Sequence, residues 1–237
     1  MTPKEAIQFI VQDYIGPIDF VSKDIKVLKS VCAGNGLDYT VFKHDLHGIV
    51  VLVRGTDEEV DWYTNIDIRS SKMKYSGHLL SVHRGFCVRA KEIQHQIALL
   101  GLKFSSVTFI GHSMGGAIAE ILCAMARERY MAAKSIVFGS PGWLRSRRLN
   151  TIDSRFIFCD DLVTQLPLSF QSPAKDILLF DKDKHHDAAI QKKGLQVLGK
   201  KWFRFNVIMR AIWKTKWSVK GWKARHSAQR YLRAFEK

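Results

Sequence analysis

Residues 107–118 read VTFIGHSMGGAI, and they place one serine, Ser113, between two glycines. The apolar run before Ser113 predicts a strand, and the apolar spacing after Gly116 predicts a helix that packs on a sheet. Ser113 then occupies the sharp turn between them, where a strained backbone lifts its hydroxyl above the sheet edge. Gly111 and Gly115 fit this turn because side chains there would collide with the neighbouring strand and helix. The pattern favours a nucleophile elbow over a merely structural glycine-rich turn.

Strand and helix patterns alternate on both sides of this turn. The apolar periodicity predicts helices at 3–14, at 116–129 and from about Phe86 to Leu100, and strands at 38–42, 49–53, 106–110, 135–139, 155–159 and 177–180. Strands separated by helices imply parallel crossovers, and short apolar strands suit a sheet that is covered on both faces. We therefore expect one α/β domain over 1–237, with a mostly parallel central sheet and helices on both faces.

Composition supports one core and indicates a compartment. The chain has 237 residues, of which 46% are hydrophobic, enough for a single sizeable core. The beginning of the chain predicts a capped helix rather than a secretory signal, and no apolar run reaches the roughly 18 residues of a membrane-spanning helix. The four cysteines are scattered without a CxxC or Cys/His cluster, so we expect reduced thiols in a cytoplasmic setting and no metal site.

The formal net charge of +15 comes from one part of the chain. Residues 188–235 contain thirteen Lys and Arg and no Asp or Glu, whereas charges elsewhere nearly cancel. Within 188–224 the basic residues are interleaved with tryptophans, and the apolar residues from Leu198 to Trp213 fall on one helical face. Such a helix could lie peripherally on an anionic membrane or pack on the core, and both interpretations stay open. Nucleic acid is disfavoured as a partner because no recognition module accompanies the charge.

A serine nucleophile needs a base, and the base needs a carboxylate that orients it. Asp160 and Asp161 follow the predicted strand 155–159, at the edge where α/β sites assemble, and either could serve on this argument alone.

Three histidines lie downstream, namely His185, His186 and His226. The first two lie in a charged, turn-like stretch that indicates a solvated loop. His226 directly precedes the last predicted helix, from which its ring can lean over the sheet edge.

Several motifs resemble those of the fungal-type, or class three, lipases, over about Val50 to Leu232. The matching stretches are Val53–Thr56, Val82–Phe86, Gly111–Gly115, Phe138–Pro141, Asp161–Pro167, and His226 with Tyr231. In the fourth, Gly142 stands where the family pattern has arginine. The resemblance implies an α/β-hydrolase fold, favours Asp161 over Asp160, and assigns the oxyanion hole to Thr56 and the backbone of Met114.

The function that the resemblance implies is hydrolysis of a carboxylic ester in lipid, by an acylglycerol lipase or a phospholipase A. Ser113, Asp161 and His226 would form the catalytic triad, acting through an acyl-enzyme without a cofactor. His83 and His112 are expected only to pack and to form hydrogen bonds near the site. The alternatives are a thioesterase or acyltransferase, or an inactive hydrolase-fold protein that binds anionic membrane or nucleic acid.

The segment between Thr56 and Val82 is where the resemblance places a lid. Its aromatic and apolar residues are Trp62, Tyr63, Ile66, Ile68, Met73 and Tyr75. We expect either a lid that hinges over an acyl groove or an ordinary connecting loop.

Overall fold

The computed structural model describes residues 1–16, 18, 23–32, 38–55, 69–101, 105–129, 132–145, 153–158, 160–167, 169–179 and 224–236. The residues outside these ranges include Thr56, the first part of the predicted lid segment (57–68), His185, His186 and the basic segment up to residue 223. Within the described ranges, no helix has both the length and the apolar character needed to cross a bilayer.

A seven-stranded sheet runs through the centre of the molecule in the order β1-β2-β3-β6-β7-β8-β9. The strands are β1 (Ile25–Val31), β2 (Tyr39–His44), β3 (Gly48–Val53), β6 (Ser106–His112), β7 (Ala132–Phe138), β8 (Ser154–Phe158) and β9 (Lys175–Leu179). The pairs β1–β2 and β2–β3 are antiparallel, and every pair from β3 to β9 is parallel. The prediction of a mostly parallel sheet is confirmed.

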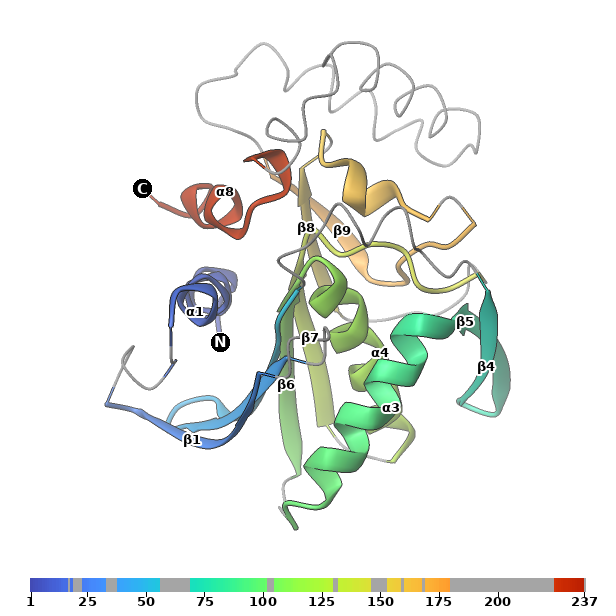
Figure 1. The fold of residues 1–237 in the computed structure, drawn as a ribbon, viewed down its shortest axis with the longest axis horizontal. Helices are drawn as coiled ribbons and strands as arrows, with labels where there is room; N and C mark the ends of the chain where they lie inside the picture. Colours follow the sequence, from blue (N-terminus) through green and yellow to red (C-terminus); the bar gives the residue numbers. More distant parts are fainter. Residues whose placement is uncertain are drawn as a thin grey trace.

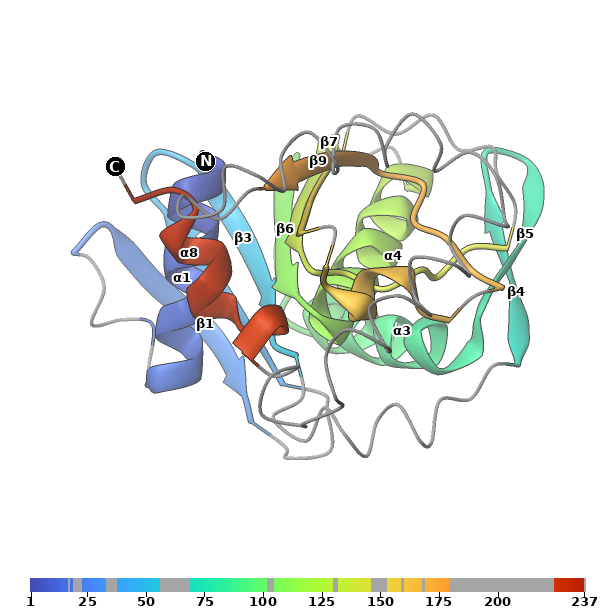
Figure 2. The ribbon, with the colours of Figure 1, turned by 90° about the horizontal axis from the view of Figure 1, so that it is seen from above.

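Helices cover both faces of this sheet (Figures 1 and 2). The first and last described helices, α1 (Pro3–Ile15) and α8 (Ala228–Arg233), lie side by side on one face. The other face carries α3 (Arg84–Ala98) and α4 (Met114–Glu128). Two apolar clusters, one on each side, fill the space between helices and sheet. The central strands are buried on both sides, which is why residues 50–53 of β3 are uniformly apolar.

Every strand and helix expected outside the basic segment is present, with boundaries shifted by up to three residues, and the helix expected within 198–213 lies outside the described residues. Strand β1 was missing from the prediction. It lies at one edge of the sheet, and a register shift between Val27 and Lys29 interrupts its alternation of buried and exposed side chains.

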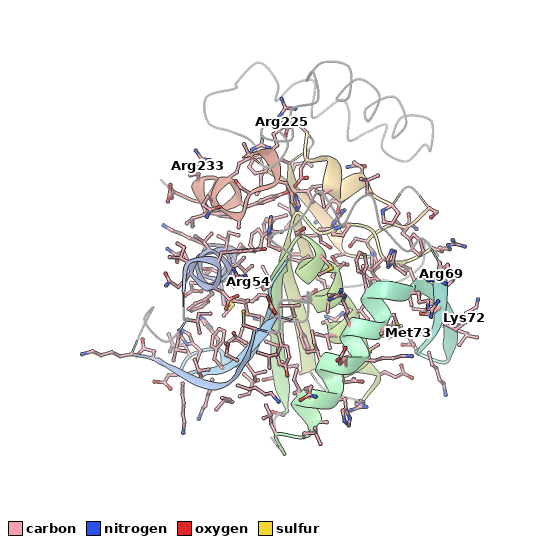
Figure 3. All side chains as sticks on the ribbon, in the orientation of Figure 1. Arg54, Arg69, Lys72, Met73, Arg225 and Arg233 are labelled. Atoms are coloured by element: carbon pink, nitrogen blue, oxygen red, sulfur yellow. The ribbon has the colours of Figure 1, made fainter. Side chains whose placement is uncertain are left out.

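The described part of the predicted lid segment is a two-stranded ribbon rather than a loop. Strands β4 (Ser70–Tyr75) and β5 (His78–His83) pair in antiparallel fashion and form a separate small sheet. Met73, which the lid hypothesis included, is buried against the core beside α3 and α4. Figure 3 shows Arg69 and Lys72 on this ribbon, far from Arg233 on α8. Trp62, Tyr63, Ile66 and Ile68 lie outside the described residues.

Candidate active site

The turn between β6 and α4 holds Ser113 in a strained conformation. Its φ of 57° and ψ of −133° lie outside the regions that a side chain normally permits, at a typical cost of about 1–3 kcal/mol. Although Ser113 occupies the N-cap position of α4, its hydroxyl makes no capping hydrogen bond to that helix. Serine at this position usually accepts a hydrogen bond from a backbone N–H in the first turn of the helix, and Ser113 does not.

Close backbone contacts explain both glycines that flank this serine. A Cβ at Gly111 would lie 2.5 Å from the carbonyl oxygen of Gly115, and a Cβ at Gly115 would collide with the carbonyl oxygen of Val53. The backbone N–H of Ser113 donates to the carbonyl of Phe138 at 3.0 Å, which ties the turn to the end of β7. The nucleophile elbow predicted from the sequence thus has the expected place between a strand and a helix.

The carboxyl ends of β8 and the start of α8 bring Asp161 and His226 together. Nδ1 of His226 lies 2.7 Å from Oδ2 of Asp161, and both side chains are fully buried. The hydroxyl of Tyr231 donates to the same carboxylate oxygen at 2.6 Å, and the N–H of Val163 donates to Oδ1 at 3.0 Å. Burial and the adjacent Asp161 raise the pKa of Tyr231 well above its usual value, so the phenol remains a donor.

The neighbouring carboxylate, Asp160, has a different partner. Its Oδ1 lies 2.9 Å from the guanidinium of Arg230, which also stacks over the ring of Phe158 at 3.9 Å. Consecutive residues of α8, Arg230 and Tyr231, therefore bind Asp160 and Asp161 respectively. Two carboxylates that the sequence pattern left equivalent are separated by the structure, and only Asp161 contacts His226.

His226 lies between the elbow and the turn after β7. Its ring stacks on that of His112, the residue before Ser113, with centroids 4.6 Å apart. Its Cε1 would be 2.9 Å from a Cβ at Gly139, which directly follows the Phe138 carbonyl that binds Ser113. The ring of His226 therefore lies against His112, which precedes Ser113, and close to Gly139, which follows the residue that binds the Ser113 N–H.

The other residues singled out in the sequence have these positions. Met114 is the first residue of α4, at the positive end of the helix dipole, and Thr56 lies outside the described residues. The roles of both in an oxyanion hole stay predictions. His83 stacks on Phe86 with centroids 4.0 Å apart and accepts its N–H, in keeping with a packing role. Among the residues that the structure describes, no three His, Cys, Asp or Glu side chains converge as metal ligands would.

Sequence comparison identifies related proteins. The model of the family Lipase (class 3) matches residues 50–171. Diacylglycerol lipase-alpha of Homo sapiens is 25% identical over 150 residues, covering 55% of this chain and 14% of that protein. Diacylglycerol lipase-beta of Mus musculus is 27% identical over 127 residues, which cover 49% of this chain and 19% of that protein. The chain thus spans less than a fifth of the length of these relatives.

Solved structures match the fold. The triacylglyceride lipase of Rhizomucor miehei superposes with a TM-score of 0.62 and 18% identity, covering 76% of this chain and 78% of that one. The Lip2 lipase of Yarrowia lipolytica gives a TM-score of 0.57 and 14% identity, and the match covers 76% of this chain and 78% of that one. The expectation of an α/β-hydrolase fold is therefore confirmed.

Proposed function

Because the chain belongs to the class 3 lipase family, we propose that it is a serine-dependent hydrolase of carboxylic esters in lipid. The observation that carries the proposal is the buried Asp161–His226 hydrogen bond, packed beside a strained serine whose hydroxyl does not cap its helix. Such an arrangement is what acyl transfer requires, namely a nucleophile, a base, and a carboxylate that fixes the tautomer of the base.

In the proposed mechanism, His226 takes the proton of Ser113 as its oxygen attacks the acyl carbon. Asp161 holds Nδ1 of His226 in its protonated state, so that Nε2 is the basic nitrogen. Thr56 and the backbone N–H of Met114 stabilise the oxyanion of the tetrahedral intermediate. Losing one such donor typically costs about 10²- to 10³-fold in rate. The intermediate then collapses as His226 gives this proton to the leaving alcohol, and the acyl group stays on Ser113. Water attacks the acyl-enzyme while His226 takes its proton, and His226 returns the proton to Ser113 as the carboxylic acid is released.

We propose acylglycerols as the substrate class, with phospholipids as the second candidate. Two of the relatives are named diacylglycerol lipases, which supports a neutral glycerolipid. The acid-free basic stretch at 188–235 supports contact with anionic lipid, either as a membrane surface or as a phospholipase A substrate.

An activity-based probe tests the proposal. A fluorophosphonate should label the wild-type protein, and Ser113→Ala should abolish labelling while circular dichroism shows a folded chain. A panel of diacylglycerol, triacylglycerol, phosphatidylcholine and an acyl thioester then separates lipase, phospholipase and thioesterase activities. Folded wild-type protein that is not labelled would instead favour a binding protein that keeps the hydrolase scaffold.

A second comparison tests the assignment of the base. His226→Ala should lose hydrolysis to the level of Ser113→Ala, and His186→Ala should retain it. The reverse result would transfer the role to His186.

A further inference from the structure

Tyr14, near the end of α1, contacts both chain segments that lead into the candidate site. The backbone N–H of Gly55 donates to the Tyr14 hydroxyl at 3.1 Å, and that hydroxyl lies 3.4 Å from Nδ1 of His112. Gly55 directly precedes Thr56, and His112 directly precedes Ser113. One phenol thus joins the segment before the predicted oxyanion residue to the segment before the predicted nucleophile.

The direction of each hydrogen bond follows from the chemistry of its groups. Nε2 of His112 lies 2.7 Å from the carbonyl oxygen of His226, which can only accept, so Nε2 carries the hydrogen. Burial, and then the proximity of His226, lowers the pKa of His112 well below its usual value, so the ring is neutral and Nδ1 is an acceptor. The hydroxyl of Tyr14 therefore donates to Nδ1 while its oxygen accepts the N–H of Gly55.

These bonds form one chain from Gly55 through Tyr14 and His112 to the backbone of His226. Its members come from the end of β3, from α1, from the end of β6 and from the residues that enter α8. The chain therefore links the three segments that carry the predicted oxyanion residue, nucleophile and base.

The position of the phenol is closely restricted. The guanidinium of Arg54 stacks over the Tyr14 ring at 4.9 Å, and Figure 3 shows Arg54 beside α1. A Cβ at Gly55 would lie 2.6 Å from the Tyr14 hydroxyl oxygen and 3.1 Å from Cβ of Ser113. Helix α1 is itself fixed to the sheet by buried side chains such as Ile7 and Ile10. A small shift of the hydroxyl would therefore displace the strand end, the elbow or both.

We infer that Tyr14 is a positioning residue for hydrolysis, whose hydroxyl sets the spacing between the segment that leads to Thr56 and the elbow that carries Ser113. The inference rests on the proposed function. Tyr14 acts on the reaction only through its neighbours, and its loss should slow the chemical step without weakening substrate binding.

The first test compares two tyrosine-to-phenylalanine variants. Tyr14→Phe should lower kcat by about tenfold with KM unchanged, because displacing reacting groups by a fraction of an ångström is costly. Tyr39→Phe is the control: Tyr39 is buried where Tyr14 is half-buried, and the Tyr39 hydroxyl has no hydrogen-bond partner among the described residues. That variant should keep the wild-type kcat, and both should melt within a few degrees of the wild type.

A double-mutant cycle tests whether the bonds act as one chain. His112→Gln keeps an amide N–H that can reach the His226 carbonyl but removes the acceptor of the Tyr14 hydroxyl. The double variant Tyr14→Phe/His112→Gln should then be no slower than the slower single variant, because coupled residues are non-additive. Losses that multiply would overturn the inference.

Nitrogen-15 NMR gives a readout that is independent of turnover. The Nδ1 resonance of His112 should move downfield in Tyr14→Phe as its hydrogen bond is lost, and stay unchanged in Tyr39→Phe. An unchanged resonance, or equal kcat values for the two variants in a protein that hydrolyses esters, overturns the inference alone. A wild type without hydrolysis overturns the proposed function as well.

Discussion

Two buried carboxylates, Asp161 and Glu120, lie near consecutive residues of the turn that follows β7. Oδ2 of Asp161 is 3.2 Å from where a Cβ of Gly139 would be, and Oε1 of Glu120 accepts the Ser140 hydroxyl at 3.1 Å. Both side chains are almost completely removed from solvent, with exposed fractions of 0% and 3%. Their burial is thus nearly the same, and their partners differ.

The partners of Glu120 hold loops together. Its carboxylate also accepts the indole N–H of Trp143 at 2.5 Å and the hydroxyl of Ser172 at 2.7 Å, so that α4 is joined to two loops. None of these donors loses a proton near neutral pH. Asp161 instead binds the imidazole of His226, which stacks on His112, the residue before Ser113. Burial of an acid is therefore not enough to mark a catalytic group, and the group it orients is what distinguishes the two.

The largest expected effect is the loss of the Asp161 charge. Asp161→Asn should lower kcat by about 10⁴-fold, since the amide favours the wrong tautomer of His226 while the geometry is kept. The fold should survive, because Val163 can still donate to the amide oxygen and the Tyr231 hydroxyl can accept from the amide N–H. The measurement is kcat on a soluble ester, with the melting temperature recorded in parallel.

The adjacent acid supplies the control for that variant. Asp160→Asn weakens only the contact with Arg230 and should change kcat by no more than about threefold, because an ion pair near the surface contributes little. Equal losses in the two variants would contradict the assignment of Asp161.

Glu120 should affect stability as a function of pH rather than turnover. The pKa of Glu120 is raised from 4.5 to about 7, mainly because its carboxyl group is buried. Between these two pH values the folded chain therefore binds more protons than the unfolded chain. Stability from this group is complete below pH 4.5 and is lost as the pH rises to about 7, by about 3 kcal/mol as an order of magnitude. Urea unfolding between pH 4.5 and 8 should show this decline.

Glu120→Gln should reduce that decline, since the amide does not titrate, and should leave kcat nearly unchanged. Parallel stability curves for the wild type and the variant would show that Glu120 does not carry the pH dependence.

A smaller loss of activity than that of Asp161→Asn is expected at Gly139, between the two carboxylates. Gly139→Ala places a methyl group 2.9 Å from Cε1 of His226 at a residue with φ of 58°. The imidazole must move by a few tenths of an ångström, and kcat should fall by about tenfold.

Gly77→Ala is the matched control for Gly139→Ala. It has a similar backbone conformation, with φ of 76°, and nothing lies within 4 Å of the added Cβ. Both variants should lose about 1 kcal/mol of stability from the strained backbone, and only Gly139→Ala should lose activity.

Apolar runs predicted most of the fold because the central strands are buried on both faces. Apolar patterns did not predict the strands that are only partly buried. Edge strand β1 contains Lys26, Lys29 and Ser30, and β4 buries only Met73, so neither has the composition of a core strand. Their pairing depends on residues elsewhere in the chain, which periodicity within a short window does not report.

The turn that carries Ser113 was predictable because its residues are consecutive. His226 was favoured from its place before the last predicted helix, and the choice of Asp161 over Asp160 needed the family resemblance. The structure adds Tyr14, Arg230 and Glu120, which the sequence did not single out. Tyr14 and His112 are separated by 98 positions, and Arg230 and Asp160 by 70. Their roles arise from contacts between distant segments, for which no local pattern exists.

The position of His226, shortly before α8, has a consequence for biosynthesis. The segments that carry Ser113 and Asp161 leave the ribosome first, and the proposed base follows 65 residues after its carboxylate. Until α8 docks beside α1, a nascent chain holds a nucleophile without a base. Under the proposed mechanism, a lipid-cleaving enzyme of this design stays inactive during its synthesis until the segment that carries His226 has packed against Asp161.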